Sequence, residues 1–122
     1  MTEFYVQLLA VIALLETGNG IKDNGDAIGK YQIRPIYVRD VNRFMQTIFE
    51  HEDARNDQAA SFMVFYYLKY YGRKMYERTG RKPTVYDLAM IHRLGPFGYT
   101  HADHDYGIRA VNLFNEMKGE RK

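Results

Sequence analysis

Residues 2–20, TEFYVQLLAVIALLETGNG, decide how the rest of the chain has to fold. Residues 2–16 contain neither glycine nor proline and begin at Thr2, a suitable N-cap, so they predict one helix that ends at the following Gly18 and Gly20. This helix is apolar on nearly all sides, which is typical of a helix buried by its neighbours. Glu16, its last residue, is therefore expected to place a carboxylate at the edge of the core.

The size and composition of the chain limit what it can be. Of its 122 residues, 46% are hydrophobic and 15% aromatic, which fits one compact domain over residues 1–122 and leaves no room for a second core. The formal net charge of +2 permits an anionic polymer as partner without requiring one. The sequence has no cysteine, which excludes disulfides and thiolate metal sites. We expect a monomer without a cofactor.

No segment of the sequence predicts a membrane span or an export signal. The most apolar stretch, residues 8–15, is far shorter than the roughly 20 residues that a membrane-spanning helix needs. A signal peptide needs a basic region before its apolar segment, and the charged side chain there is Glu3. We therefore expect a protein that is made in the cytoplasm and has no membrane partner.

Further helices are predicted at residues 35–44, 59–78, 85–93 and 105–117. Thr84 with Asp87 three residues later resembles a capping pair, and Gly72 is a point where the long aromatic-rich helix could bend. Residues 21–35 are rich in glycine and aspartate and predict a loop or small hairpin, and residues 50–57 predict a second loop. The expected fold class is α+β, mainly α, with a small Gly-rich hairpin or loop segment.

Two carboxylates close in the sequence suit glycosidic-bond cleavage. A glycosidase needs one carboxylic acid that stays protonated near neutral pH and usually a second carboxylate that stays ionised. Glu16 ends an apolar helix, where desolvation favours the protonated acid. Asp23 follows in a polar, Gly-rich loop, where it is expected to remain charged.

Three motifs follow one another along most of the chain. They are the segment with Glu16-Thr17, Asp23-Asn24-Gly25, AIGKYQI at residues 27–33, Pro35-Ile36-Tyr37 and Asp40; the segment YLKYYG at residues 67–72; and the segment AMIHRLGPFG at residues 89–98. In this order they resemble the invertebrate-type (destabilase-like) lysozymes. They are also similar to goose-type lysozymes and lytic transglycosylases, which share a Glu-Ser, a Gly-x-x-Gln-Ile and a following Tyr or Trp.

The resemblance implies a lysozyme-like domain that hydrolyses peptidoglycan at the β-1,4 bond between N-acetylmuramic acid and N-acetylglucosamine. Glu16 matches the general acid, and Asp23 matches the second carboxylate, which is the nucleophile in invertebrate-type lysozymes. If Asp23 is only structural, the resemblance to lytic transglycosylases implies that Glu16 acts as both acid and base while the sugar's own hydroxyl attacks. The residues expected to bind sugar are Tyr31, Gln32, His92 and Tyr99.

The chain departs from the family pattern at the third motif. Arg93-Leu94 stand where the family has Asn-Gly in a segment that faces the sugar, so a module that binds glycan or a protein without cleavage remains the alternative. The absence of cysteines favours a bacterial or bacteriophage relative over an animal one. Without an export signal, such an enzyme would reach the wall by lysis, through a holin-type pore or on a phage particle.

Two other patterns have simpler explanations. A polar cluster before the last predicted helix consists of His101, Asp103, His104 and Asp105. Imidazole and carboxylate together suit zinc or iron, but adjacent polar residues before a helix are more typical of a capped loop, so no metal is expected. Cations interleave the aromatics of the long helix at Lys69, Arg73 and Lys74. Aromatics at helical spacing are more often core than a nucleic-acid surface, so no nucleic-acid partner is expected.

Overall fold

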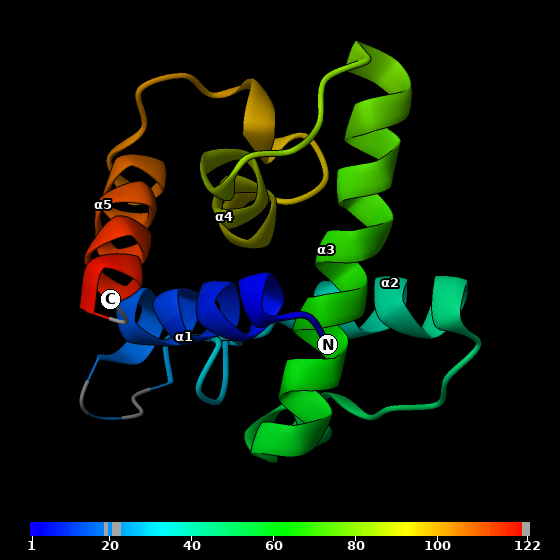
Figure 1. Cartoon of the computed structure of the whole chain (residues 1–122). Coiled ribbons are helices and arrows are strands. Elements are labelled where there is room, and N and C mark those ends of the chain that lie inside the picture. The colour runs from blue at the N-terminus through cyan, green and yellow to red at the C-terminus, as the bar shows by residue number, and fades with distance from the viewer. Residues whose placement is uncertain (19, 21–22, 121–122) are drawn as a thin grey trace.

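Helices account for most of the molecule, as its computed structural model shows for residues 1–18, 20 and 23–120. The described residues form α1 (Glu3–Thr17), α2 (Pro35–Met45), the 3-10 helix η1 (His51–Arg55), α3 (Asp57–Thr79), α4 (Val85–Leu94), the 3-10 helix η2 (Gly98–Thr100) and α5 (Asp105–Glu120). The prediction of a mainly helical chain is confirmed, and the helix ends differ from the predicted ones by a turn or less. In Figure 1, α3 stands on one side and α5 on the other, with α1 and α4 between them.

The first helix, α1, supplies a large part of the core. Thr2 caps it by accepting a hydrogen bond from the backbone N–H of Tyr5, and Gly18 ends it with a positive φ of 59°. The residues of α1 that are buried in the core are Leu8, Leu9, Val11, Ile12 and Ala13. The expectation of burial on all sides is wrong, because Val6 and Leu14 are 48% and 44% exposed. In the described residues α1 packs against α5 and α3, which leave one face open.

The Gly-rich segment between α1 and α2 is a compact loop. Its pairing consists of two isolated bridges, Asn24 with Ala27 and Ile28 with Ile33, so the β part of the expected α+β fold amounts to bridges without a strand in the described residues. Gly29 has a φ of 77°, and a Cβ there would collide with the carbonyl oxygen of Ala54. The loop is thereby packed tightly onto η1, which lies in the segment expected to be irregular. Asn19, Ile21 and Lys22, part of the predicted turn and loop, lie outside the described residues.

The long helix α3 runs unbroken past Gly72, where the sequence allowed a bend. The lack of a side chain at Gly72 lets α3 pack closely against Leu88 and Pro83, because a Cβ there would lie 3.1 Å from Leu88 and 3.4 Å from Pro83. The predicted capping pair is confirmed: Thr84 and Asp87 form a reciprocal capping box at the start of α4. The helix α4 packs between α3 and α5, and its C-terminal residues line the candidate site described below. Among the described residues, no helix is both long and apolar enough to cross a membrane.

Candidate active site

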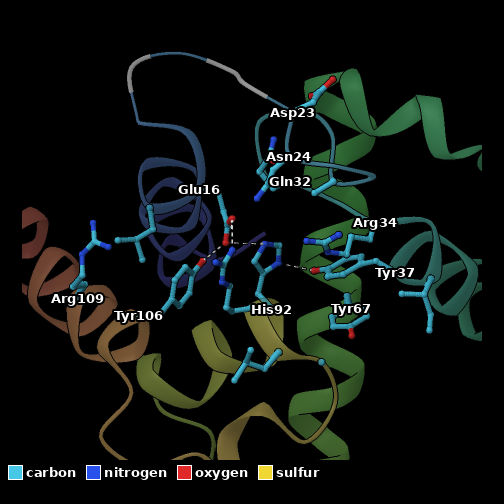
Figure 2. Close-up of a pocket in the computed structure, with 16 residues that line it drawn as sticks. Glu16, Asp23, Asn24, Gln32, Arg34, Tyr37, Tyr67, His92, Tyr106 and Arg109 are labelled. Carbon is cyan, nitrogen blue, oxygen red and sulfur yellow. Dashed lines mark hydrogen bonds and ion pairs between the residues drawn. The ribbon is translucent and has the colours of Figure 1, made fainter.

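An open cleft of about 860 Å³ lies between the Gly-rich loop and the helices. Figure 2 draws the sixteen residues that line it, which come from α1, the loop, α2, α3, α4 and α5. The cleft has polar residues, among them Asn24 and Gln32, and partly exposed apolar ones such as Ile36 and Leu94. Two carboxylates, those of Glu16 and Asp23, are among its lining residues.

The carboxylate of Glu16 lies at the junction of α1, α4 and α5. Its side chain is only 5% exposed, although it lines the cleft. The hydroxyl of Tyr106 donates a hydrogen bond of 2.7 Å to Oε2, and Nη1 of Arg93 donates one of 3.2 Å to Oε1. Figure 2 shows Tyr106 of α5 pointing toward Glu16. The expectation of a carboxylate at the edge of the core is confirmed, and its donors fix the orientation of both oxygens.

His92 of α4 lies next to Glu16 and bonds two other residues of the site. Its Nε2 lies 2.9 Å from the carbonyl oxygen of Tyr31, and its Nδ1 lies 2.9 Å from the hydroxyl of Tyr37. A carbonyl can only accept, so Nε2 carries the proton and Nδ1 accepts from the Tyr37 hydroxyl. Burial lowers the pKa of His92 despite the proximity of Glu16, whose Oε2 lies 4.0 Å from Nε2. His92 is therefore a neutral, doubly hydrogen-bonded residue that fixes α4 to the loop.

Asp23, the predicted second carboxylate, is held within the loop wall of the cleft. Its Oδ2 forms an ion pair of 2.7 Å with Nη2 of Arg55, and its Oδ1 accepts a hydrogen bond from the backbone N–H of Gly29. These bonds, first the one from Arg55 and then the one from Gly29, lower the pKa of Asp23, as expected for the ionised partner. In Figure 2, however, its carboxylate is directed away from Glu16. The contacts are those of a residue that fastens the loop to η1.

The four residues expected to bind sugar have different positions. Gln32 lines the cleft with a φ of 54°, and its side-chain amide donates to the carbonyl oxygen of Gly29. His92 also lines it, but its ring nitrogens are used as described above. Neither Tyr31 nor Tyr99 is among the lining residues. The ring of Tyr31 is buried in the core and Tyr99 packs against that core, so both placements differ from the expectation.

Several residues of the cleft were not predicted from the sequence, and two of them come from α5. Tyr106 and Arg109 line the cleft, and Tyr106 is 90 residues from its partner Glu16. No local motif marks a tyrosine that becomes a hydrogen-bond donor through such a distant contact. Arg93 was recognised as a departure from the family pattern, but not as an ion-pair partner of Glu16.

The polar cluster before α5 forms local hydrogen bonds. His104 accepts a hydrogen bond from the backbone N–H of Tyr106 through Nδ1, and its own backbone N–H donates to the hydroxyl of Tyr86. The hydroxyl of Tyr86 in turn donates to the carbonyl oxygen of His101. Over the described ranges, no group of three or more His, Cys, Asp or Glu residues is arranged to hold a metal ion.

Comparisons with known proteins add no relative: no protein-family model, no curated protein and no solved structure matches the chain.

Proposed function

We propose that the protein is a lysozyme-like glycosidase that cleaves the bond between N-acetylmuramic acid and N-acetylglucosamine in peptidoglycan, with Glu16 as its acid. The observation that carries the proposal is the environment of Glu16: a side chain 5% exposed at the wall of an open cleft, with two donors that orient its oxygens. A buried carboxyl group next to a space for substrate suits proton transfer to a leaving oxygen.

The remaining cleft residues suit a sugar. Ile36 and Leu94 are 62% and 45% exposed, and they offer apolar surface to the faces of pyranose rings and to acetyl groups. Asn24 and Gln32 place amide groups on the opposite, loop side of the cleft, where hydrogen bonds to hydroxyls or acetamido groups can be formed. Apolar and amide groups together support binding of an N-acetylated glycan.

The position of Asp23 favours a reaction in which Glu16 acts alone. Glu16 first donates its proton to the glycosidic oxygen, and the bond between this oxygen and C1 of the muramyl sugar breaks. The resulting carboxylate then accepts the proton of the C6 hydroxyl, whose oxygen forms the new bond to C1. The products are a free 4-hydroxyl and a 1,6-anhydro end. Asp23 would contribute only by fixing the shape of the loop, since Arg55 and Gly29 bond its carboxylate.

One observation favours the second candidate, a glycan-binding module without catalysis. Arg93 donates to Oε1 of Glu16 at 3.2 Å and Tyr106 donates to Oε2, so both carboxyl oxygens already have partners in the cleft wall. If Arg93 does not move when glycan binds, both oxygens of Glu16 stay occupied and the cleft only binds glycan.

Mass spectrometry of soluble products separates these candidates. Purified peptidoglycan is incubated with the wild type, with Glu16→Gln and with Asp23→Asn. We expect 1,6-anhydro muropeptides from the wild type and from Asp23→Asn, and none from Glu16→Gln. Reducing muropeptides that depend on Asp23 would instead establish hydrolysis with Asp23 as the second carboxylate. Saturable binding to the wall without any product would establish the non-catalytic module, and products from Glu16→Gln would refute the assignment of Glu16.

A further inference from the structure

The loop side and the helix side of the cleft differ in the pairing of their carboxylates and guanidinium groups. On the loop side each carboxylate has its own guanidinium, Asp23 with Arg55 and Asp26 with Arg34. On the helix side the cleft wall holds one carboxylate, Glu16, and two arginines, Arg93 and Arg109. Arg93 is its ion-pair partner, whereas Arg109 has no ion pair with any residue that the structure describes.

Arg93 is bound to Glu16 but remains accessible. Its side chain is 49% exposed, and its guanidinium lies over the ring of Tyr106, 5.4 Å from the ring centroid. Arg109 lies one turn beyond Tyr106 on α5, and both guanidinium groups act electrostatically on the Tyr106 hydroxyl. Both cations therefore lie near the Tyr106 hydroxyl, which bonds Glu16.

Protonation of Glu16 changes this balance. The charged and titratable groups around its carboxyl group are Tyr37 on α2, His92 and Arg93 on α4, and Tyr106 and Arg109 on α5. When Glu16 is protonated, as the proposed acid must be, Arg93 loses its counter-ion, and Arg109 has none among the described residues. An anion bound next to these arginines compensates their positive charge. Binding of the anion and protonation of Glu16 then favour each other.

We propose that Arg93 and Arg109 form a subsite for a carboxylate of the muramyl unit, and that this carboxylate draws Arg93 away from Glu16 when substrate binds. The inference rests on the proposed function and names the feature of the glycan that the cleft distinguishes. A guanidinium fork suits a carboxylate, with which it can form two parallel hydrogen bonds. The subsite thus makes Arg93 a specificity-determining residue at the position where the sequence departs from the family pattern.

The muramyl unit can supply this carboxylate in two ways. Its 3-O-lactyl group ends in a carboxylate where the stem peptide has been removed, and the stem peptide carries carboxylates of its own where it is present. N-acetylglucosamine carries none. If the lactyl carboxylate is the ligand, the best substrate is a strand from which an amidase reaction has removed the peptides.

Calorimetric titration of Glu16→Gln tests the subsite, because this variant keeps a neutral side chain of the same shape as the protonated acid. The probes are a peptide-free tetrasaccharide of alternating N-acetylglucosamine and N-acetylmuramic acid, the same tetrasaccharide with its lactyl groups converted to methylamides, and the peptide-bearing tetrasaccharide. We expect the free carboxylate to bind about tenfold more tightly than the methylamide at low salt, the effect of one charge-assisted hydrogen bond. Comparison of the peptide-bearing and peptide-free probes shows whether the subsite binds the lactyl carboxylate or a carboxylate of the stem peptide.

Second-site variants in the Glu16→Gln background assign the effect to the two arginines. Arg93→Gln and Arg109→Gln should each remove most of the tenfold preference, and Arg93→Lys should retain part of it because the charge remains. Arg73→Gln on α3, outside the cleft, changes the net charge equally and should leave the preference intact. Thermal unfolding of each variant by circular dichroism checks that it is folded.

The outcomes separate the subsite from the proposed function. Equal binding of the carboxylate and methylamide probes would overturn the subsite while leaving a glycan-binding cleft in place. A preference that persists in both Arg93→Gln and Arg109→Gln would also overturn it. If none of the three probes binds to folded Glu16→Gln, both the subsite and the peptidoglycan assignment fail.

Discussion

The two walls of the cleft are built in different ways. On the helical wall, formed by Glu16, His92, Arg93 and Tyr106, the polar groups bond across the chain: Glu16 meets partners 77 and 90 residues away. On the loop wall, formed by residues 23–34, most bonds are local: Gln32 donates to Gly29, three residues away, and Arg34 pairs with Asp26, eight residues away. The exceptions tie the loop to other elements: Asp23 pairs with Arg55 on η1, and the carbonyl oxygens of Lys30, Tyr31 and Ile33 bond the side chains of Thr17, His92 and His51.

The difference indicates separate roles for the two walls. Local bonds satisfy the loop's own polar groups and give it a fixed shape, as turn residues commonly do. The long-range bonds on the helical wall hold the carboxyl group of Glu16 in a nearly buried position, where its polar atoms need partners. We therefore assign chemistry to the helical wall and shape to the loop wall, and the following variants test this assignment.

The largest expected effect is on catalysis. Glu16→Gln should lower the rate of peptidoglycan cleavage by about 10³-fold, which corresponds to about 4 kcal/mol of activation free energy, because the amide cannot donate the proton. Asp23→Asn should stay within about fivefold of the wild type, since a residue that acts only through loop shape has no part in proton transfer. Turbidity loss of a peptidoglycan suspension measures both. Equal losses in the two variants would contradict the division between the walls.

The next effect is on stability and concerns the loop wall. Gly29→Ala should lower the free energy of unfolding by about 3 to 4 kcal/mol, because a Cβ there meets the Ala54 carbonyl oxygen at a backbone φ of 77°. Gly25→Ala is the matched control: its φ is 62°, but no atom lies within 4 Å of the added Cβ, so about 1 kcal/mol is expected. Urea denaturation gives both values. Similar losses at the two positions would mean that backbone strain, not the contact with η1, dominates.

On the helical wall, His92→Leu should cost about 3 kcal/mol of unfolding free energy. The substitution leaves the carbonyl of Tyr31 and the hydroxyl of Tyr37 buried without their partner. Arg55→Gln, which breaks the more exposed pair with Asp23 on the other wall, should cost clearly less. The reverse order in urea denaturation would contradict the buried connection proposed for His92.

Stability should also depend on pH through His92. Its pKa is lower in the folded state than the ordinary value of 6.5, so the unfolded chain binds the proton more readily. The contribution is therefore complete above pH 6.5 and is lost as the pH falls below it, by at most about 1.4 kcal/mol per pH unit. Urea denaturation at pH 7.5, 6.5 and 5.5 should show this loss in the wild type, and a smaller one in His92→Leu. Parallel pH profiles of the two proteins would assign the loss to other groups.

The smallest expected effect concerns the hydroxyl of Tyr106. Tyr106→Phe removes the 2.7 Å hydrogen bond to Glu16 and should cost about 1.5 kcal/mol of unfolding free energy. Tyr76→Phe, at a side chain 47% exposed on α3, is the control and should change stability by less than about 0.5 kcal/mol. Thermal denaturation followed by circular dichroism compares the two.

Most of the helices and the position of Glu16 were predictable because their signals are local. Thr2, the Thr84 and Asp87 capping box and Gly95 mark helix ends within a few residues of the chain. The apolar run before Glu16 indicated a carboxylate at the edge of the core, where the structure places it. The open face of α1 was not predictable, because its exposure depends on which helices pack beside it.

The site beyond Glu16 was only partly predictable for the same reason. Gln32 and His92 do line the cleft, but Tyr31 contributes a backbone carbonyl to His92 while its ring is buried in the core. Tyr99 packs against the core outside the lining. Motif spacing places a residue near a site without fixing the direction of its side chain.

The sequence by itself determined the mainly helical fold, the helix ends and the place of Glu16 at the end of an apolar helix. Propensity, capping and hydrophobic periodicity act between residues a few positions apart, so they can be read along the chain. Only the tertiary structure decided that Tyr106 and Arg93 bond Glu16 and that Arg55 holds Asp23. Those contacts depend on how separate elements pack, since packing brings together side chains whose separation along the chain carries no local signal.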